Sequence, residues 1–225
     1  MMAIVVNGAT CSLGESVVDK LLSMDIDVVA TEESHSLRNE TLLKYSQAKL
    51  LSEGEGYSVS FDGSVADLEV GNHIVINDLI PTRVDKWMPE EIVQWSKQKE
   101  FKCQPRYWVS VIDAANAIAH IAKSEIKISQ MNLCGRREWL PEDSKAEFDM
   151  LWSRTNQGLS GNFTAETLFG HEIAGMHAKP ISPDTNSRPD LDPLHKVLVD
   201  TTGDGWRPLV PLRTALMTLI ADMIG

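Results

Sequence analysis

Residues 8–14, Gly-Ala-Thr-Cys-Ser-Leu-Gly, are the stretch of the sequence with the clearest chemical potential. The short apolar run at residues 3–7 precedes them, and residues 16–22 follow with apolar side chains at helical spacing. A helix that starts directly after such a turn presents free backbone N–H groups and the positive end of its dipole. These groups favour an anion, typically a pyrophosphate, so we expect the turn to hold one through Gly8, Thr10, Cys11, Ser12, Leu13 and Gly14.

The elements around this turn form a βαβ unit. Residues 3–7 and 26–30 are predicted to be buried parallel strands joined by the helix at 16–22, with a right-handed crossover. An acid near the end of the second strand of such a unit binds ribose hydroxyls, and Glu32 lies at this place. Further strands are predicted at 57–61 and 73–77. The sequence therefore predicts an α/β fold with a Rossmann-like, doubly wound parallel sheet.

The pattern Gly8-Ala9-Thr10-x-x-Leu13-Gly14 resembles the N-terminal fingerprint of the extended short-chain dehydrogenase/reductases, the family of NAD-dependent nucleotide-sugar epimerases and dehydratases. This resemblance implies NAD or NADP as the cofactor, with Glu32 on the ribose. Arg38 keeps NADP open, because an arginine there could hold a 2′-phosphate. Cys11 stands where the family has a glycine that lets the backbone approach the phosphates closely, so its side chain would weaken or reposition a dinucleotide.

Residues 38–53 consist of strong helix formers without a breaker, which predicts a helix with Tyr45 and Lys49 on one face. In the resembled family a Tyr-x-x-x-Lys pair is the catalytic core. Its tyrosine exchanges a proton with the substrate oxygen, and its lysine binds the nicotinamide ribose and lowers the tyrosine pKa. The resemblance therefore implies that Tyr45 and Lys49 are catalytic. Members of the family place this pair after five strands and only two precede it here, so an ordinary surface helix is the alternative.

Residues 107–119 predict a short strand that runs into a helix, and they are similar to the family's corresponding segment. Arg106 stands where the family often has an arginine near the nucleotide part of the substrate. Arg188, the Gly-Trp-x-Pro turn at 205–208 and a final helix at 212–224 also follow in the family's order. The resemblance implies that Arg106 and Arg188 bind substrate, the latter by pairing with a diphosphate. A solvated charge and a loop residue are the alternatives.

The composition excludes several classes of function. The chain has 225 residues and a net charge of -11, and such an acidic surface argues against non-specific nucleic-acid binding and against docking on anionic membranes. It has no apolar stretch of about 18 residues, which a bilayer span would need. Residues 1–6 lack the pattern of a signal peptide.

The cysteines favour a reducing compartment. Cys11, Cys103 and Cys134 are odd in number and lack Cys-x-x-Cys spacing, so they predict neither a disulfide framework nor a zinc site. We therefore expect a cytoplasmic protein without a metal site.

These observations predict a truncated Rossmann-like dinucleotide-binding domain over residues 1–130 and a smaller α-rich substrate-binding region over 131–225. The resemblance implies an NAD(P)-dependent oxidoreductase or epimerase-like protein that acts on a nucleotide-linked sugar as a homodimer. The chain is shorter than typical members, and two placements of the missing part are open. If residues 45–53 are the catalytic helix, earlier strands have been lost. If residues 1–80 are an ordinary first half, the catalytic helix has been lost, and the chain is a non-catalytic nucleotide-binding or oligomerisation protein.

Overall fold

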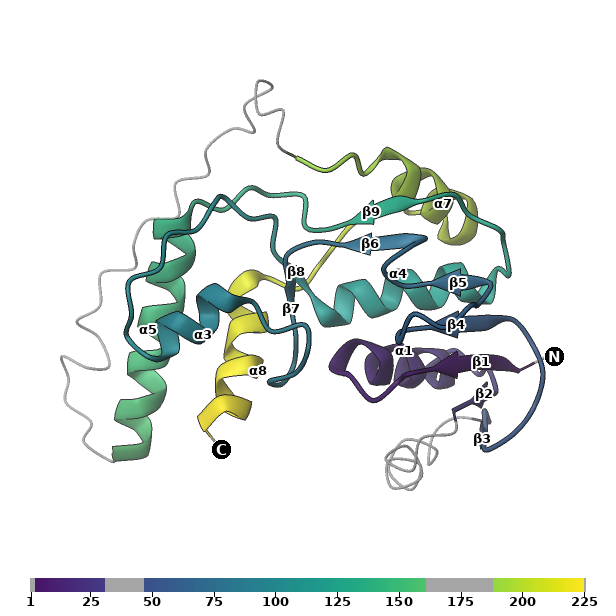
Figure 1. The fold of residues 1–225 in the computed structure, drawn as a ribbon, viewed down its shortest axis with the longest axis horizontal. Coiled ribbons are helices and arrows are strands. Elements are labelled where there is room, and N and C mark those ends of the chain that lie inside the picture. The colour runs from purple at the N-terminus through teal and green to yellow at the C-terminus, as the bar shows by residue number, and fades with distance from the viewer. Residues whose placement is uncertain (1–2, 31–46, 161–187, 225) are drawn as a thin grey trace.

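A parallel β-sheet forms the centre of the N-terminal half of the protein. The computed structural model describes residues 3–30, 47–160 and 188–224, with the backbone alone at 157–160 (Figure 1). The sheet has the spatial order β3-β2-β1-β4-β5, and all its neighbouring strands are parallel. The strands are β1 (Ile4–Asn7), β2 (Val28–Val29), β3 (Leu50–Leu51), β4 (Ser58–Ser60) and β5 (Leu68–Glu69). A parallel sheet with the first strand in its middle is the doubly wound arrangement, so the predicted Rossmann-like α/β fold is confirmed.

Two further strand pairs continue the parallel architecture. β6 (Ile74–Ile76) pairs with β9 (Met131–Leu133), and β7 (Leu79–Ile80) pairs with β8 (Val109–Ser110). The predicted strands at 26–30, 57–61 and 73–77 are thus present in shorter form.

Helices α1 (Ser12–Ser23) and α4 (Val111–Lys123) pack against each other beside the sheet (Figure 1). The buried face of α1 carries Val17, Val18, Leu21 and Leu22, as the apolar spacing predicts. The buried face of α4 is rich in alanine, which lets two helices approach closely. Helix α7 (Asp192–Thr202) packs on α4 and β9 and completes this first core.

A second hydrophobic core lies between α3 (Glu90–Ser96), α5 (Pro141–Ser160) and α8 (Leu212–Ile224). The Phe148 ring is stacked on Trp152 with ring centroids 5.5 Å apart, and it lies 5.8 Å from the Trp95 ring. β9 and α7 belong to the first core, and α3 belongs to the second. No helix within the described ranges is long and apolar enough to cross a membrane.

The helix predicted over residues 38–53 is wrong in its described part, 47–53. None of these residues is helical; Leu50 and Leu51 form β3, which pairs with β2. The backbone N–H of Lys49 donates to Asp27 Oδ1 at 2.7 Å, and its carbonyl accepts from the N–H of Val28 at 3.0 Å. Strand pairing in the folded protein overrides the helix propensity of the sequence, which is only a weak preference.

Candidate functional site

The turn between β1 and α1 requires small residues for reasons of packing. Gly8 has a φ of +68°, and a Cβ there would lie 2.6 Å from the Cβ of Asp62, which follows β4. A Cβ on Gly14 would lie 2.6 Å from the Cα of Ala9. Close packing therefore explains both glycines without any ligand. The turn lies close to the residues after β4 at Gly8, and α1 lies close to Ala9 at Gly14.

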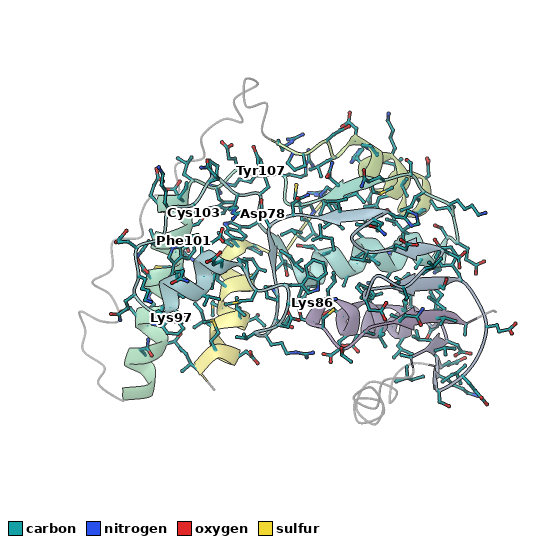
Figure 2. The ribbon with its side chains drawn as sticks, in the orientation of Figure 1. Asp78, Lys86, Lys97, Phe101, Cys103 and Tyr107 are labelled. Carbon is teal, nitrogen blue, oxygen red and sulfur yellow. The ribbon has the colours of Figure 1, made fainter. Side chains whose placement is uncertain are left out.

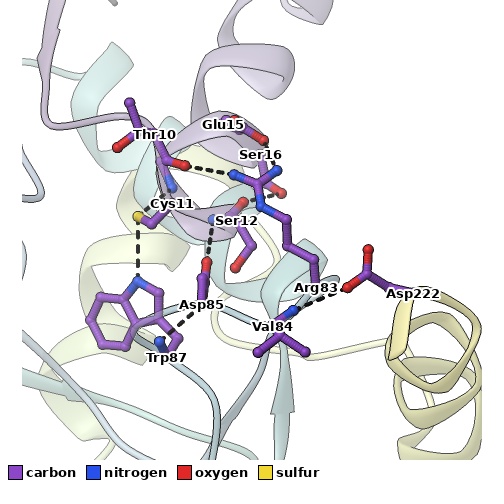
Figure 3. A network of polar contacts seen from close by, with 11 residues as sticks. Thr10, Cys11, Ser12, Glu15, Ser16, Arg83, Val84, Asp85, Trp87 and Asp222 are labelled. Atoms are coloured by element: carbon purple, nitrogen blue, oxygen red, sulfur yellow. Dashed lines mark hydrogen bonds and ion pairs between the residues drawn. The ribbon is translucent and has the colours of Figure 1, made fainter. Parts of the chain in front are cut away.

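Cys11 caps the amino end of α1 with its side chain. Its Sγ accepts from the Gly14 N–H at 3.4 Å and from the indole N–H of Trp87, also at 3.4 Å (Figure 3). The residue is buried, so the sulfur fills the space beneath the turn. One of the amides that an anion would use is thus already taken by the chain's own N-cap.

The carboxylate of Asp85 lies at the amino end of α1. Its Oδ2 accepts from the Ser12 N–H at 2.6 Å, and its Oδ1 accepts from the Trp87 N–H at 2.9 Å (Figure 3). A negative charge is favoured here by the helix dipole and the free amides. This carboxylate therefore takes the position that the sequence assigns to a pyrophosphate.

The segment that carries Asp85, residues 81–88, is fastened to three parts of the fold. Arg83 donates to the carbonyl oxygen of Thr10 at 2.6 Å and forms an ion pair with Glu15 in the first turn of α1. The Val84 N–H donates to Asp222 of α8 at 3.1 Å. Lys86 Nζ donates to the carbonyl oxygen of Phe61, directly after β4. These contacts hold the 81–88 segment across the turn, and Figure 3 shows those of Arg83 and Val84.

A dinucleotide does not fit the described arrangement of these residues. The amides of Ser12 and Gly14 are engaged by Asp85 and Cys11, so a pyrophosphate would lack these donors and would meet the Asp85 charge. Hydrogen bonds from Ser64 and Ser60 lower the pKa of Asp62 to about 2, which keeps a second carboxylate ionised beside Gly8. A phosphate could bind at the turn between β1 and α1 only after Asp85 had left the Ser12 amide.

The structure brings together the predicted residues of the turn, namely Gly8, Thr10, Cys11, Ser12, Leu13 and Gly14. Their roles differ from the prediction in two ways. The Leu13 side chain is fully buried in the first core, and the carbonyl of Thr10 is used by Arg83. Glu32 and Tyr45 lie outside the described residues.

The structure does not place Lys49 near this turn. Lys49 is exposed and lies directly before β3. Because β1, β2 and β3 are parallel, the start of β3 lies at the opposite edge of the sheet from Gly8, which follows the end of β1. Because these residues pair as a strand and do not form the predicted helix, Lys49 stays away from the turn between β1 and α1.

Arg106 is held by two carboxylates. Its Nε donates to Glu91 at 2.6 Å and its Nη1 to Asp78 at 3.0 Å. Asp78 also accepts from the N–H of Tyr107 at 2.7 Å, and Figure 2 shows these two residues together near the middle of the molecule. Arg106 therefore joins α3 to the region before β8, and a substrate would compete with these pairs.

Arg188 is exposed and lies within electrostatic range of Cys134. Burial raises the pKa of the Cys134 thiol to about 12, with Asp78 raising it further and Arg188 lowering it.

Sequence reasoning missed the 81–88 segment. Asp85 lies 73 residues from the amide that it accepts from, and no spacing connects the two. The available signal was a run of charged residues with a tryptophan between a buried strand and a helix, which also describes an ordinary surface loop.

Comparisons with known proteins agree with the fold. No family model matches the sequence, and no curated protein matches it. The structure is similar to a UDP-glucose 4-epimerase from Stenotrophomonas maltophila with bound NAD and formylated UDP-arabinopyranose, with a TM-score of 0.57 and 8% identity over 100% of this chain and 98% of that one. A UDP-glucose 4-epimerase from Thermotoga maritima with UDP-glucose gives 0.56 and 11%, over 99% of each chain.

A dTDP-glucose 4,6-dehydratase from Bacillus anthracis str. Ames in complex with NAD gives a TM-score of 0.52 and 11% identity, over 100% of this chain and 97% of that one. At such low identities these likenesses concern the fold. The resemblance to the extended short-chain dehydrogenase/reductases that the sequence indicates is therefore confirmed at the level of the fold.

Proposed function

We propose that this chain, which shares its fold with nucleotide-sugar epimerases and dehydratases, is a non-catalytic Rossmann-fold protein. The observation that carries the proposal is the hydrogen bond of 2.6 Å between the Ser12 amide and the Asp85 carboxylate. It supplies the amino end of α1 with an anion from within the chain. The position of Lys49 at the opposite edge of the sheet also supports the proposal, because the catalytic pair implied by the resemblance is then not assembled at this corner.

In this proposal the 81–88 segment replaces a bound dinucleotide as the group that holds the turn. Asp85 satisfies the helix amide, and Trp87 covers Cys11. Arg83 ties the segment to both Thr10 and Glu15. The geometry of the turn is thereby kept by contacts within the protein.

An NAD(P)-dependent, epimerase-like activity on a nucleotide-linked sugar is the second candidate. Two observations favour it, namely the fold and the buried hydroxyl of Ser12, which has no hydrogen-bond partner among the described residues. It requires the 81–88 segment to withdraw so that the pyrophosphate reaches the Ser12 amide. Arg106 and Arg188 would then be the candidates for the substrate diphosphate, and two chains would form the homodimer that the resemblance implies.

Titration with NADH and NADPH, followed by nicotinamide fluorescence, separates these candidates. We expect the wild-type protein to show no saturable binding at micromolar concentrations and no hydride transfer with UDP-glucose. Asp85→Ala and Asp85→Asn remove the competing charge and should bind either dinucleotide more tightly than the wild type. Asp200→Ala, which removes an equal charge from an exposed site on α7, should behave as the wild type.

Two results would overturn the proposal. One is saturable micromolar binding to the wild-type protein that the Asp85 variants leave unchanged. The other is turnover by the wild-type protein with either dinucleotide.

A further inference from the structure

We propose that a cavity of about 320 Å³ beside the amino end of α8, referred to below as the arginine pocket, binds a small phosphorylated ring compound. None of its lining residues belongs to the turn between β1 and α1 or to the 81–88 segment. Its walls come from Trp108, which directly precedes β8, from the residues after β9, from α5, and from the start of α8 with the residues before it. Its basic members are Arg136, Arg137, Arg207 and Arg213.

The pocket is positively charged in an acidic protein. Four arginines line it and Glu147 is its one acidic lining residue, which gives a formal charge of +3 from 4 − 1, whereas the whole chain carries -11. Glu147 is buried and already forms two hydrogen bonds with Arg213, at 2.9 and 2.8 Å. The charge of Glu147 is thereby offset by Arg213.

Arg136 and Arg207 are the residues that we assign to the anion. Both are exposed, and neither forms an ion pair with a described residue. They come from segments about 70 residues apart that the fold brings to one cavity. A guanidinium binds a phosphate through two parallel N–H donors, so two such groups on one cavity favour a phosphate.

Helix α8 contributes a second, independent feature that favours an anion. Leu212 and Arg213, at its amino end, line the pocket. The first turn of α8 contains no acidic residue that could neutralise the helix dipole. The amino end of this helix of 13 residues adds to the positive potential of the arginines, although the Asp113 carboxylate accepts from the amides of Leu209 and Val210 just before the helix.

Trp139, which is half-buried, offers the pocket an aromatic ring, whereas Trp108 is only 7% exposed and belongs to the second core. The guanidinium of Arg137 lies 4.2 Å from the centroid of the Trp139 ring, so a cation and an indole are stacked in the wall. Trp108 also lines the pocket, and its indole N–H donates to Ser144 at 2.9 Å. Stacked planar groups of this kind bind flat heterocycles with little selectivity among them.

The frame of the pocket is fixed by close backbone contacts. A Cβ on Gly135 would lie 2.1 Å from the carbonyl oxygen of Trp108. The residues after β9 therefore approach the residue before β8 so closely that only glycine fits. Arg106 and Trp139 exchange two backbone hydrogen bonds of 2.9 and 2.8 Å. On the other side, Asp113 accepts from the amides of Leu209 and Val210 at 3.0 and 2.9 Å. The walls are thus positioned before a ligand arrives.

The volume limits the size of the ligand. Ligand cavities generally measure about 300–1,000 Å³, so this one lies at the small end. It suits one phosphorylated ring and is too small to enclose a dinucleotide. The ligand class is therefore a ring monophosphate of the size of UMP, AMP or phenyl phosphate.

Calorimetric titration with UMP, AMP and phenyl phosphate tests this proposal. At least one of the three should bind saturably, and its affinity should fall as salt is added, because the contact is ionic. Uridine, which lacks the phosphate, and inorganic phosphate, which lacks the ring, should each bind at least tenfold more weakly. Arg136→Ala and Arg207→Ala should each weaken binding about tenfold.

The matched control is Arg154→Ala, which removes an exposed arginine of α5 outside the pocket and should leave the affinity unchanged. Thermal unfolding of the three variants without ligand shows whether they remain folded. Absence of binding by all three ring phosphates, or binding that survives the loss of both arginines, would overturn the proposal, as would equally tight binding of an acidic peptide. None of these results depends on Asp85, so this test and that of the proposed function fail independently.

Discussion

Asp62 and Asp85 bring two carboxylates to the edge of the sheet where β1 and β4 end. Asp62 lies against Gly8, and its Oδ1 accepts from the Ser60 hydroxyl at 3.0 Å and from the Ser64 N–H at 2.9 Å. Asp85 accepts from the amide of Ser12. Each carboxylate accepts hydrogen bonds from donors of the chain itself, and those from Ser64 and Ser60 hold the pKa of Asp62 well below its ordinary value.

The lowered pKa of Asp62 predicts a specific loss of stability in acid. Its value of about 2 lies below the ordinary 3.8, so the unfolded chain binds a proton here more readily than the folded one. The contribution is fully present above pH 3.8 and is lost as the pH falls from 3.8 to about 2. Urea unfolding across this window should show that Asp62→Asn loses less stability than the wild type. Parallel losses in the two proteins would contradict the assignment.

Single residues differ in how far the sequence predicts them. Gly8 and Gly14 follow from the sequence, because a strand that turns at once into a helix needs small residues at the points of close approach. The partners of Ser12 and Cys11 do not, because Asp85 and Trp87 reach the turn only through the path of the 81–88 segment. The four arginines of the arginine pocket come from two segments about 70 residues apart, and no spacing in the sequence connects these segments.

At the scale of elements, periodicity predicts the helices well and fails at β3. Helices α1, α4 and α8 have apolar faces that repeat at helical spacing, and burial of those faces fixes them. Strand β3 has only two residues, Leu50 and Leu51, which also suit a helix. Its strand conformation comes from the β2 edge and the acceptor side chain of Asp27, neither of which is local in sequence.

The packing of α4 against α1 predicts that larger side chains on its buried face destabilise the protein. Ala119 is completely buried on α4, and Asn116 is exposed on the same helix. Ala119→Leu should lower the free energy of unfolding by about 1–3 kcal/mol, because a close-packed core admits extra methylene groups only with strain. Asn116→Leu adds a similar side chain to the surface and should change it by less than about 0.5 kcal/mol. Equal effects in urea unfolding would show that α4 does not approach its neighbours closely.

At the scale of the whole molecule, β7 and β8 form a wall between the two hydrophobic cores (Figure 1). Leu79 and Val109 belong to the first core, whereas Ile80 and Trp108, the residue directly before β8, belong to the second. Successive residues of a strand point to opposite faces, so one pair of strands supplies side chains to both cores. Loss of either core would expose one face of this wall.

The shared wall predicts a single cooperative unfolding transition. Phe148 is fully buried in the second core, and Phe148→Ala should lower the free energy of unfolding by about 3–5 kcal/mol. Because the cores are coupled, the midpoints measured by tryptophan fluorescence and by far-ultraviolet circular dichroism should shift together. Separation of the two midpoints in the variant would mean that the second core unfolds by itself. The predicted homodimer is tested by sedimentation equilibrium of the native wild-type protein, whose chain mass is 25.0 kDa.

The hydrogen bond from Ser12 to Asp85 has a consequence for how the protein responds to the metabolic state of a cell. A protein that binds a nucleotide in its native state alone gains stability as the concentration of that nucleotide rises. Here the counter-charge to α1 is covalently part of the chain and is present at a constant effective concentration. The melting temperature should therefore be indifferent to the supply of NAD or NADP, and the abundance of the folded protein should not follow redox conditions.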